Sequence, residues 1–291
     1  MKKSFIKAAI FLLFINFLSA QEYGVVLSGG GGKGAYEVGV WKALYEYGIA
    51  QKTTAISGTS VGGLNAALFS CIKDINEIER IWVTMVPSRL TQNDALISQE
   101  GLGTIIDRIS LNKLQRNPYP QVFVTAVKNK FLAGKIFTKK PGTNATRFNL
   151  NSEAYTSEIK NKLLATSAFP IVCKPIKLSD GNEYVDGGFE QAGGDNVPID
   201  PITQTRPKGT NINKIFIIFL SNKPSRDYRD IDYDQYELIR IIPSIDLGNI
   251  LDGTTNFTAN RIQLLIKTGY NDAVKVLNRH GFKPVLSYWF E

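Results

Sequence analysis

Two strand–turn–helix units follow one another near the start of the chain, and this repetition constrains the fold more than any other feature. Residues 23–27 form a short apolar run that leads into the glycines of residues 29–34, after which apolar residues recur at helical spacing. Residues 53–57 repeat the strand, residues 58–63 the turn and residues 64–73 the helix. Strands that alternate with helices in this way favour a parallel sheet covered by helices. The sequence therefore predicts an α/β fold.

The rest of the chain offers further strands and helices for this sheet. Residues 121–127 and 215–220 are apolar runs typical of buried strands, and the second run is apolar enough to be expected centrally in the sheet. Residues 131–150 are expected to form two strands around a turn. Helices are expected over residues 152–164 and over most of residues 236–280.

The first twenty residues differ in character from those that follow. Lysines at positions 2, 3 and 7 flank the start of an apolar run at residues 8–18. This run is shorter than the about 20 apolar residues that span a bilayer. It predicts a secretory signal peptide cleaved near Ala20, with a membrane-anchoring or amphipathic helix as the alternative. We therefore expect an exported protein, periplasmic or secreted, in which residues 21–291 form a single domain, because no linker, repeat or low-complexity block divides them.

Composition and charge exclude several classes of protein. The 291 residues are 43% apolar and 21% charged, which is the profile of a folded protein rather than a disordered or fibrous one. The net charge of +8 falls to +5 when the three lysines of residues 1–20 are removed; this mild surplus would help the protein to approach an anionic membrane, but no basic run is dense enough to predict nucleic-acid binding. Cys71 and Cys173 are expected to be buried free thiols, with a single disulfide as the alternative in an exported protein.

Residues 29–34 hold five glycines and one lysine, so that the backbone there can approach another group closely. A P-loop requires Gly-Lys followed by Ser or Thr, whereas Lys33 is followed by Gly34. A dinucleotide site requires an acidic residue about 20 positions further on, whereas the second strand ends at Ser57 without a carboxylate. We therefore expect no nucleotide. Backbone N–H groups of successive glycines can instead form an oxyanion hole, which stabilises the charge of a tetrahedral acyl intermediate.

An oxyanion hole requires a nucleophile nearby, and the second turn supplies a candidate. Residues 58–62 read Gly-Thr-Ser-Val-Gly, a G-x-S-x-G motif between a strand and a helix. In a nucleophile elbow of this kind, a sharp turn lifts the serine clear of the sheet, and the N-terminus of the following helix favours negative charge. Gly58 and Gly62 relieve crowding around the turn, which makes Ser60 the candidate nucleophile.

Ser60 needs a base, because a free hydroxyl is a weak nucleophile at neutral pH. The single histidine, His280, would complete a Ser–acid–His triad, but Ser60 comes early in the chain for an α/β-hydrolase elbow, and the sequence around His280 is typical of a helix end. Asp186 in Tyr-Val-Asp-Gly-Gly is the other candidate, since a buried carboxylate of raised pKa could take the proton directly. An Asp-Gly-Gly run by itself is an ordinary turn, so the residues alone leave both bases open.

Three stretches taken together resemble the patatin-like phospholipase family. The glycine-rich loop and first helix of that family are similar to LSGGGGKGAYEVGVWKAL, and its nucleophile elbow is similar to TTAISGTSVGGLNAAL. The region of its catalytic aspartate is similar to ATSAFP followed by YVDGG. The resemblance covers residues 24–72 and 163–198. The family reaches an Asn-x-Pro soon after Asp-Gly-Gly, whereas seven residues intervene here before Asn196, so we expect a longer loop beside Asp186.

The resemblance implies a three-layer α/β/α sandwich with a mainly parallel central sheet, and a Ser–Asp dyad that works without histidine. Ser60 would be the acylated nucleophile and Asp186 the general base, and the N–H groups of Gly30, Gly31 and Gly32 would form the oxyanion hole. The residues expected to support these motifs are Gly29, Lys33, Gly34, Gly58, Gly62, Gly187 and Gly188. No metal or other cofactor is implied for the chemistry.

As an exported bacterial member of this family, the protein is expected to hydrolyse acyl esters of phospholipids or other lipids, as a phospholipase A or a lysophospholipase, with peripheral contact to the membrane. Two alternatives remain, a triad esterase that uses His280 and a non-catalytic lipid-binding protein on the same scaffold. Residues 87–120 carry apolar side chains at helical spacing between positions 102 and 109. These side chains are expected to pack in the core, with a lid as the alternative.

Overall fold

The fold is known from a computed structural model of the chain. The structure describes residues 21–90, 98–129, 142–170, 172–204, 209–224 and 235–285. The expected signal peptide, and the first of the two strands expected within residues 131–150, lie outside these ranges. Within the described ranges, no helix combines the length and the hydropathy that crossing a bilayer requires.

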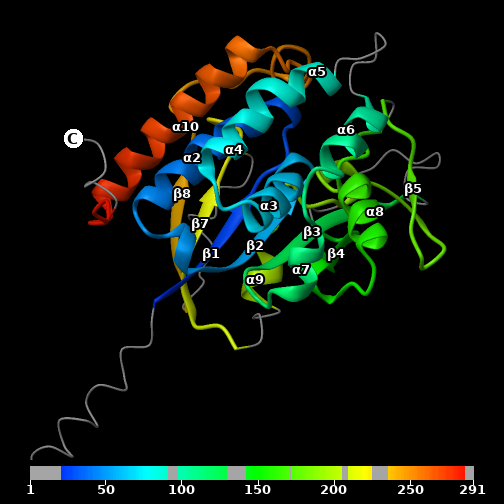
Figure 1. The fold of residues 1–291 in the computed structure, drawn as a ribbon, viewed down its shortest axis with the longest axis horizontal. Helices are drawn as coiled ribbons and strands as arrows, with labels where there is room; N and C mark the ends of the chain where they lie inside the picture. The colour runs from blue at the N-terminus through cyan, green and yellow to red at the C-terminus, as the bar shows by residue number, and fades with distance from the viewer. Residues whose placement is uncertain are drawn as a thin grey trace, which may run out of the picture.

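Eight strands form one mixed sheet (Figure 1). The strands are β1 (Glu22–Leu27), β2 (Thr53–Thr59), β3 (Gln121–Lys128), β4 (Ala145–Asn149), β5 (Ile176–Lys177), β6 (Glu183–Asp186), β7 (Ile212–Ile218) and β8 (Glu237–Ile241). Neighbours in the series β3-β2-β1-β7-β8 are parallel, whereas β4 and β6 pair antiparallel with β3, and β5 antiparallel with β6. The expected α/β fold with a mainly parallel sheet is confirmed.

Two of the expected elements differ from the structure. The apolar strand β7 lies between β1 and β8, one strand from the edge of the sheet rather than at its centre. The segment expected to be helical from residue 236 begins with strand β8, and the helix follows only from residue 259. In β8, Ile239 and Ile241 are buried while Glu237 is exposed. This alternation is only five residues long, so pairing with β7, rather than local pattern, decides the structure.

Nine helices are described, and they connect or cover the strands. They are α2 (Ala35–Glu46), α3 (Val61–Cys71), α4 (Ile75–Arg80), α5 (Val86–Leu90), α6 (Gln99–Ile106), α7 (Asn112–Arg116), α8 (Thr156–Thr166), α9 (Asp200–Thr203) and α10 (Ala259–Arg279). Short 3₁₀ turns lie at Gly31–Gly34, Ala50–Lys52, Leu150–Ser152 and Glu190–Ala192, and π-helical turns at Ile81–Met85 and Ile250–Thr254. The helix expected over residues 152–164 is present as α8.

Alternate side chains of the strands pack on opposite faces of the sheet. On β1, Val25 and Leu27 belong to the larger apolar core, which also contains side chains of α2, α3 and α10. Val26 belongs instead to a smaller core that includes Ile202 of α9. Figure 1 shows α2 and α10 side by side over one face of the sheet. The sheet thus lies between two helical layers, and the architecture is an α/β/α sandwich.

Strands β2 and β6 share one edge of β3. Residues 123–125 of β3 pair with both β2 and β4, and residues 126–127 pair with both β4 and β6. Because a strand has only two edges, β2 and β6 must lie on the same edge, opposite β4. β2 runs parallel to β3 and β6 runs antiparallel, so their carboxyl ends meet where Thr59 pairs with Thr125 and Asp186 with Ala126. Side chains at these two strand ends are thereby brought together.

Candidate active site

Ser60 occupies the tight turn between β2 and α3. Its backbone angles are φ 56° and ψ −126°, and it is the only described residue other than glycine with a positive φ. A backbone conformation of this kind costs on the order of 1–3 kcal/mol and persists only where the surroundings enforce it. Gly58 and Gly62 permit the turn, because a methyl group on Gly58 would lie 2.3 Å from the carbonyl carbon of Gly62. The turn therefore has the strained geometry of a nucleophile elbow.

Asp186, the last residue of β6, lies directly against Ser60. Ser60 Oγ donates a hydrogen bond to Asp186 Oδ2 at 2.6 Å, and the Gly188 N–H donates to Asp186 Oδ1 at 2.7 Å. Asp186 is only 4% exposed. Burial raises the pKa of its carboxyl to about 6, although the hydrogen bonds from Ser60 and Gly188 oppose this rise. The arrangement suits proton transfer from the hydroxyl to the carboxylate near neutral pH.

The glycine loop borders the same cavity as Ser60 and Asp186, through Gly29, Gly30 and Gly31. Gly31 has φ 56°, and a methyl group on it would lie 2.3 Å from the carbonyl oxygen of Thr254. Only glycine fits there without strain. The structure thus brings Gly30 and Gly31, two of the three expected oxyanion-hole residues, to the cavity of Ser60. The third, Gly32, is not among the residues that line this cavity and packs closely against the carbonyl group of Asn256.

Contacts from both sides hold the glycine loop. Lys33 Nζ donates to the carbonyl oxygen of Gly248 at 3.4 Å, and burial lowers the pKa of the Lys33 ammonium group. The Gly29 N–H donates to the Asn196 carbonyl oxygen at 3.1 Å, and Asn196 Nδ2 donates back to the Gly29 carbonyl oxygen at 3.4 Å. The longer loop after Asp186 therefore folds back so that its end clamps the glycine loop.

The other glycines expected to support the motifs also pack closely against neighbouring atoms. A methyl group on Gly187 would lie 2.2 Å from the carbonyl oxygen of Thr125, where the ends of β2 and β6 meet. A methyl group would also lie within 3.0 Å of a neighbouring atom at Gly29, Gly34, Gly62 and Gly188. The glycines thus allow the two turns and the glycine loop to approach one another.

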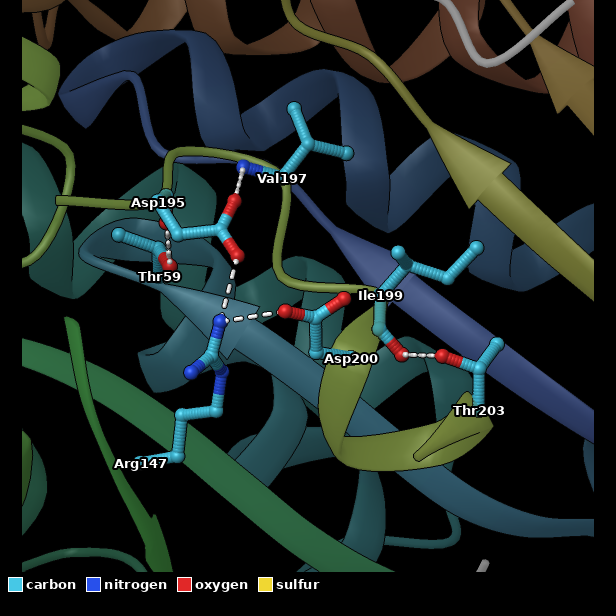
Figure 2. Close-up of polar contacts among 7 residues, drawn as sticks. All are labelled: Thr59, Arg147, Asp195, Val197, Ile199, Asp200 and Thr203. Carbon is cyan, nitrogen blue, oxygen red and sulfur yellow. Dashed lines mark hydrogen bonds and ion pairs between the residues drawn. The ribbon is translucent and has the colours of Figure 1, made fainter. Parts of the chain in front are cut away.

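A polar network fixes the segment before Asn196 (Figure 2). Thr59, the residue before the candidate nucleophile, donates from Oγ1 to the carbonyl oxygen of Asp195 at 2.7 Å. The buried carboxylate of Asp195 accepts from the Val197 N–H at 3.3 Å and pairs with Arg147 of β4 at 3.4 Å. Arg147 also pairs with Asp200 of α9 at 2.6 Å. The loop is therefore fastened both to β2 and to β4.

An apolar cavity of about 380 Å³ extends from the dyad into the helical layer. Its apolar wall consists of Val61, Leu64, Leu68, Ile81, Trp82, Val86, Leu90, Leu102, Ile105, Ile106, Ile109, Phe169 and Phe257. Leu68 lies eight residues after Ser60 on α3, so the wall continues for about 12 Å along that helix. The side chains at positions 102–109 pack in the core, as expected, and also face the cavity. Its volume falls in the range of sites that bind small organic ligands.

A family model covers most of the part of the chain that builds this site. Residues 25–202 match the model described as "Patatin-like phospholipase". The chain belongs to this family. The matched range includes both turns with their following helices and the two residues of the Ser60–Asp186 contact.

The individual relatives and solved structures that match this patatin-like chain share less than a quarter of its residues. It is 24% identical over 218 residues to "Lysophospholipase NTE1" of Cryptococcus neoformans and 23% identical over 188 residues to "Neuropathy target esterase sws" of Drosophila melanogaster. These alignments cover 73% and 64% of this chain but only 12% of each relative. The crystal structure of VipD from Legionella pneumophila matches with a TM-score of 0.56 and 14% identity over 89% of this chain and 67% of that one, which supports the fold alone.

His280 lies apart from the candidate site of this patatin-like chain. It follows the last residue of α10, and its Nδ1 lies 3.4 Å from Glu237 Oε1. Glu237 starts β8, which is parallel to β2, so His280 lies at the strand-start edge of the sheet, whereas Ser60 follows a strand end. Cys71 and Cys173 are free thiols, the first buried and the second half-buried. Among the described residues, no group of His, Cys, Asp and Glu side chains is arranged to hold a metal ion.

Several residues that hold the patatin-like site were not singled out by the sequence. Thr166 accepts a hydrogen bond from the Ser60 N–H at 2.9 Å, yet only its place within ATSAFP pointed to this region. Arg147 and Asp195 meet across 48 residues of chain, without a local pattern that pairs them. The sequence shows the Asn-x-Pro that begins at Asn196, but it does not indicate the contact of Asn196 with Gly29. These contacts arise from strand order, which local motifs do not encode.

Proposed function

We propose that this chain is a serine lipid acyl hydrolase, of the phospholipase A or lysophospholipase type, that works through a Ser60–Asp186 dyad. The observation that carries the proposal is the 2.6 Å hydrogen bond from Ser60 Oγ to a buried carboxylate of raised pKa beside an apolar cavity. Membership of the patatin-like phospholipase family supports it. The lysophospholipase and esterase named among the relatives support the same class of reaction.

The first half of the reaction acylates the enzyme. Ser60 Oγ attacks the ester carbonyl carbon while its proton passes to Asp186 Oδ2. Backbone N–H groups of the glycine loop at Gly30 and Gly31 stabilise the negative charge on the carbonyl oxygen of the tetrahedral intermediate. The intermediate collapses when the bond to the alcohol oxygen breaks, and Asp186 returns the proton to that oxygen. The alcohol, such as a lysophospholipid or a glycerophosphodiester, then leaves.

The second half of the reaction regenerates the serine. A water molecule attacks the acyl carbon and gives its proton to Asp186, and the glycine loop again stabilises the charge. Collapse of the second intermediate releases the fatty acid and restores the Ser60 hydroxyl with the proton held by Asp186. Gly188 keeps the carboxylate oriented throughout, because its N–H binds the oxygen that faces away from Ser60.

The cavity is proposed to bind the acyl chain of the substrate. Aliphatic and aromatic side chains make up half of the residues that line it, and those contributed by α3 continue away from Ser60. An acyl chain in this position would lose contact with water along its length. Each buried methylene is worth about 0.8 kcal/mol, so the cavity provides a strong preference for fatty-acyl over short-chain esters.

The location of the reaction is part of the same proposal. The lysines and the apolar run of residues 1–20 support export to the periplasm or the exterior. The net positive charge would assist peripheral contact with an anionic membrane, where the lipid substrate resides.

The length of the substrate's acyl chain is expected to control activity, and this dependence tests whether the cavity binds that chain. With nitrophenyl esters from acetate to palmitate, kcat/KM should rise by about fourfold for each added methylene until the cavity is full, and then level off. Leu64→Phe, which narrows the cavity one turn after Ser60, should lower activity on long chains and spare acetate. Leu264→Phe, at an exposed position of α10, is the matched control.

An assay with lipid vesicles tests the proposed function against its alternatives. Release of fatty acid from phospholipid and lysophospholipid vesicles is expected, and mass analysis of the products identifies which ester is cleaved. A folded protein that binds these vesicles but cleaves no ester would contradict the proposal and favour a lipid-binding protein. Loss of activity in His280→Asn would favour the triad esterase instead.

A further inference from the structure

Between the ends of β2 and β6, the edge of β3 changes partner. Thr125 of β3 is paired with the last residue of β2, and Ala126 with the last residue of β6. The two ends leave the sheet at this junction, one toward Ser60 and the other toward Gly187. Neither strand continues past it, so the backbone groups around the junction must find other partners.

Thr166, the last residue of α8, occupies this junction. Its Oγ1 donates to the carbonyl oxygen of Thr125 at 2.5 Å and accepts from the Ser60 N–H at 2.9 Å. Its own carbonyl oxygen accepts from the Gly187 N–H at 3.4 Å. One residue thus binds the amide of the nucleophile and the amide that follows the aspartate. It is fully buried and is not among the residues that line the cavity.

The contact with the Ser60 N–H bears on the strained turn. Ser60 has φ 56°, and φ is the rotation that relates the N–H direction to the rest of the residue. A hydrogen bond that fixes the N–H therefore helps to hold φ at its unfavourable value. The methyl group of Thr166 packs close to Gly63 of α3, so the hydroxyl is held in one direction. Without the hydroxyl, the Ser60 N–H would lose its partner and the turn one of its restraints.

We propose that Thr166 is a positioning residue that sets the distance and direction between Ser60 and Asp186. Its side chain acts through the backbone amide of Ser60 and touches no substrate, whereas its contact with Gly187 is made by the main-chain carbonyl oxygen and is kept by any residue at this position. The proposal rests on the function proposed above, because it assigns to Thr166 the alignment of that dyad. The hydroxyl, rather than the bulk of the side chain, carries the effect.

The test compares Thr166→Val, Thr166→Ser and a matched control. Thr166→Val keeps the shape and removes the hydroxyl, whereas Thr166→Ser keeps the hydroxyl and removes the methyl group. Thr53→Val removes another buried threonine hydroxyl bond, from Thr53 Oγ1 to the Ile49 carbonyl oxygen, at the far end of β2. The readouts are the rate at which a small fluorophosphonate labels Ser60, kcat and KM for a nitrophenyl ester, and the thermal unfolding temperature.

Thr166→Val is expected to lower both the labelling rate and kcat by about 10²-fold while KM stays nearly constant, because misplacement of a reacting group acts on the transition state. Thr166→Ser should keep most of both rates, although its unfolding temperature falls. Thr53→Val should unfold at a lower temperature and keep both rates.

Equal rates in Thr166→Val and Thr53→Val would overturn the positioning role and leave Thr166 as a structural residue. An equal loss in Thr166→Ser and Thr166→Val would also overturn it, since bulk rather than the hydroxyl would then matter. A wild-type protein that is labelled at Ser60 but cleaves no lipid would contradict the proposed function alone, and the order of labelling rates would still decide the role of Thr166. A wild-type Ser60 that is never labelled would overturn both proposals.

Discussion

Ser60→Ala is expected to lower the hydrolysis of lipid esters by about 10⁴-fold or more, with the fold intact. The alanine removes the atom that forms the acyl-enzyme, and the oxyanion donors that remain can speed only the slow direct attack of water. The measurement is fatty-acid release from phospholipid and lysophospholipid vesicles at saturating substrate. The expected loss lies in kcat, because the cavity that binds the acyl chain is unchanged.

Ser57→Ala offers a matched control on β2, the strand that leads to Ser60. Ser57 is fully buried in β2, three residues before Ser60, and within the described part of the chain its Oγ has no hydrogen-bond partner. Removal of this hydroxyl should therefore leave activity unchanged and stability equal or higher. Activity that survives in Ser60→Ala would end the dyad account, whatever the behaviour of Ser57→Ala.

Asp186→Asn is expected to lower kcat by about 10³-fold, because an amide cannot accept the proton of Ser60. In the wild-type protein the base must be ionised, and burial raises its pKa to about 6. Activity should therefore rise about tenfold per pH unit below about pH 6 and level off above it. A pH profile of kcat/KM that is flat between about pH 4 and pH 8 would contradict this assignment of the base.

The same substitution should raise stability at alkaline pH. A carboxyl whose pKa is higher in the folded state destabilises the fold wherever it is ionised, so this cost is fully present above about pH 6 and disappears below the ordinary value of 3.8. At about 1.4 kcal/mol per pH unit, the cost at about pH 8 is about 3 kcal/mol. Denaturant unfolding should thus show Asp186→Asn to be more stable than wild type at about pH 8, by a margin that shrinks toward about pH 4. A variant that is less stable than wild type at both pH values would show that the carboxylate stabilises the fold.

The nucleophile turn and the glycine loop are the part of the site that local sequence patterns predict. The glycines around Ser60 and in residues 29–34 are needed where the backbone packs tightly, and each is followed by a helix whose apolar spacing is clear. The nucleophile turn and the glycine loop could therefore be located from the sequence. The repeat also predicts a parallel sheet, and because β1 and β2 are parallel neighbours, both turns lie at its carboxyl edge.

The other half of the site depends on pairing between distant segments. Asp186 reaches Ser60 because β6, a strand of four residues, pairs antiparallel with the same edge of β3 that β2 uses. No periodicity in so short a strand specifies its partner, and 126 residues separate the two side chains. The resemblance to a family assigned Asp186 as the base. Composition and spacing alone left two candidate bases for Ser60, Asp186 and His280. The contacts of Thr166 and Arg147 also join distant segments, so no local pattern predicts them.

The reaction of the protein with a fluorophosphonate, followed by mass analysis of the intact chain and of its peptides, tests the central claim most directly. We predict a single adduct on Ser60 in wild type and in His280→Asn, no adduct in Ser60→Ala, and much slower labelling in Asp186→Asn. An adduct on another side chain, or a labelling rate in Asp186→Asn equal to that of wild type, would contradict a hydroxyl activated by the carboxylate beside it.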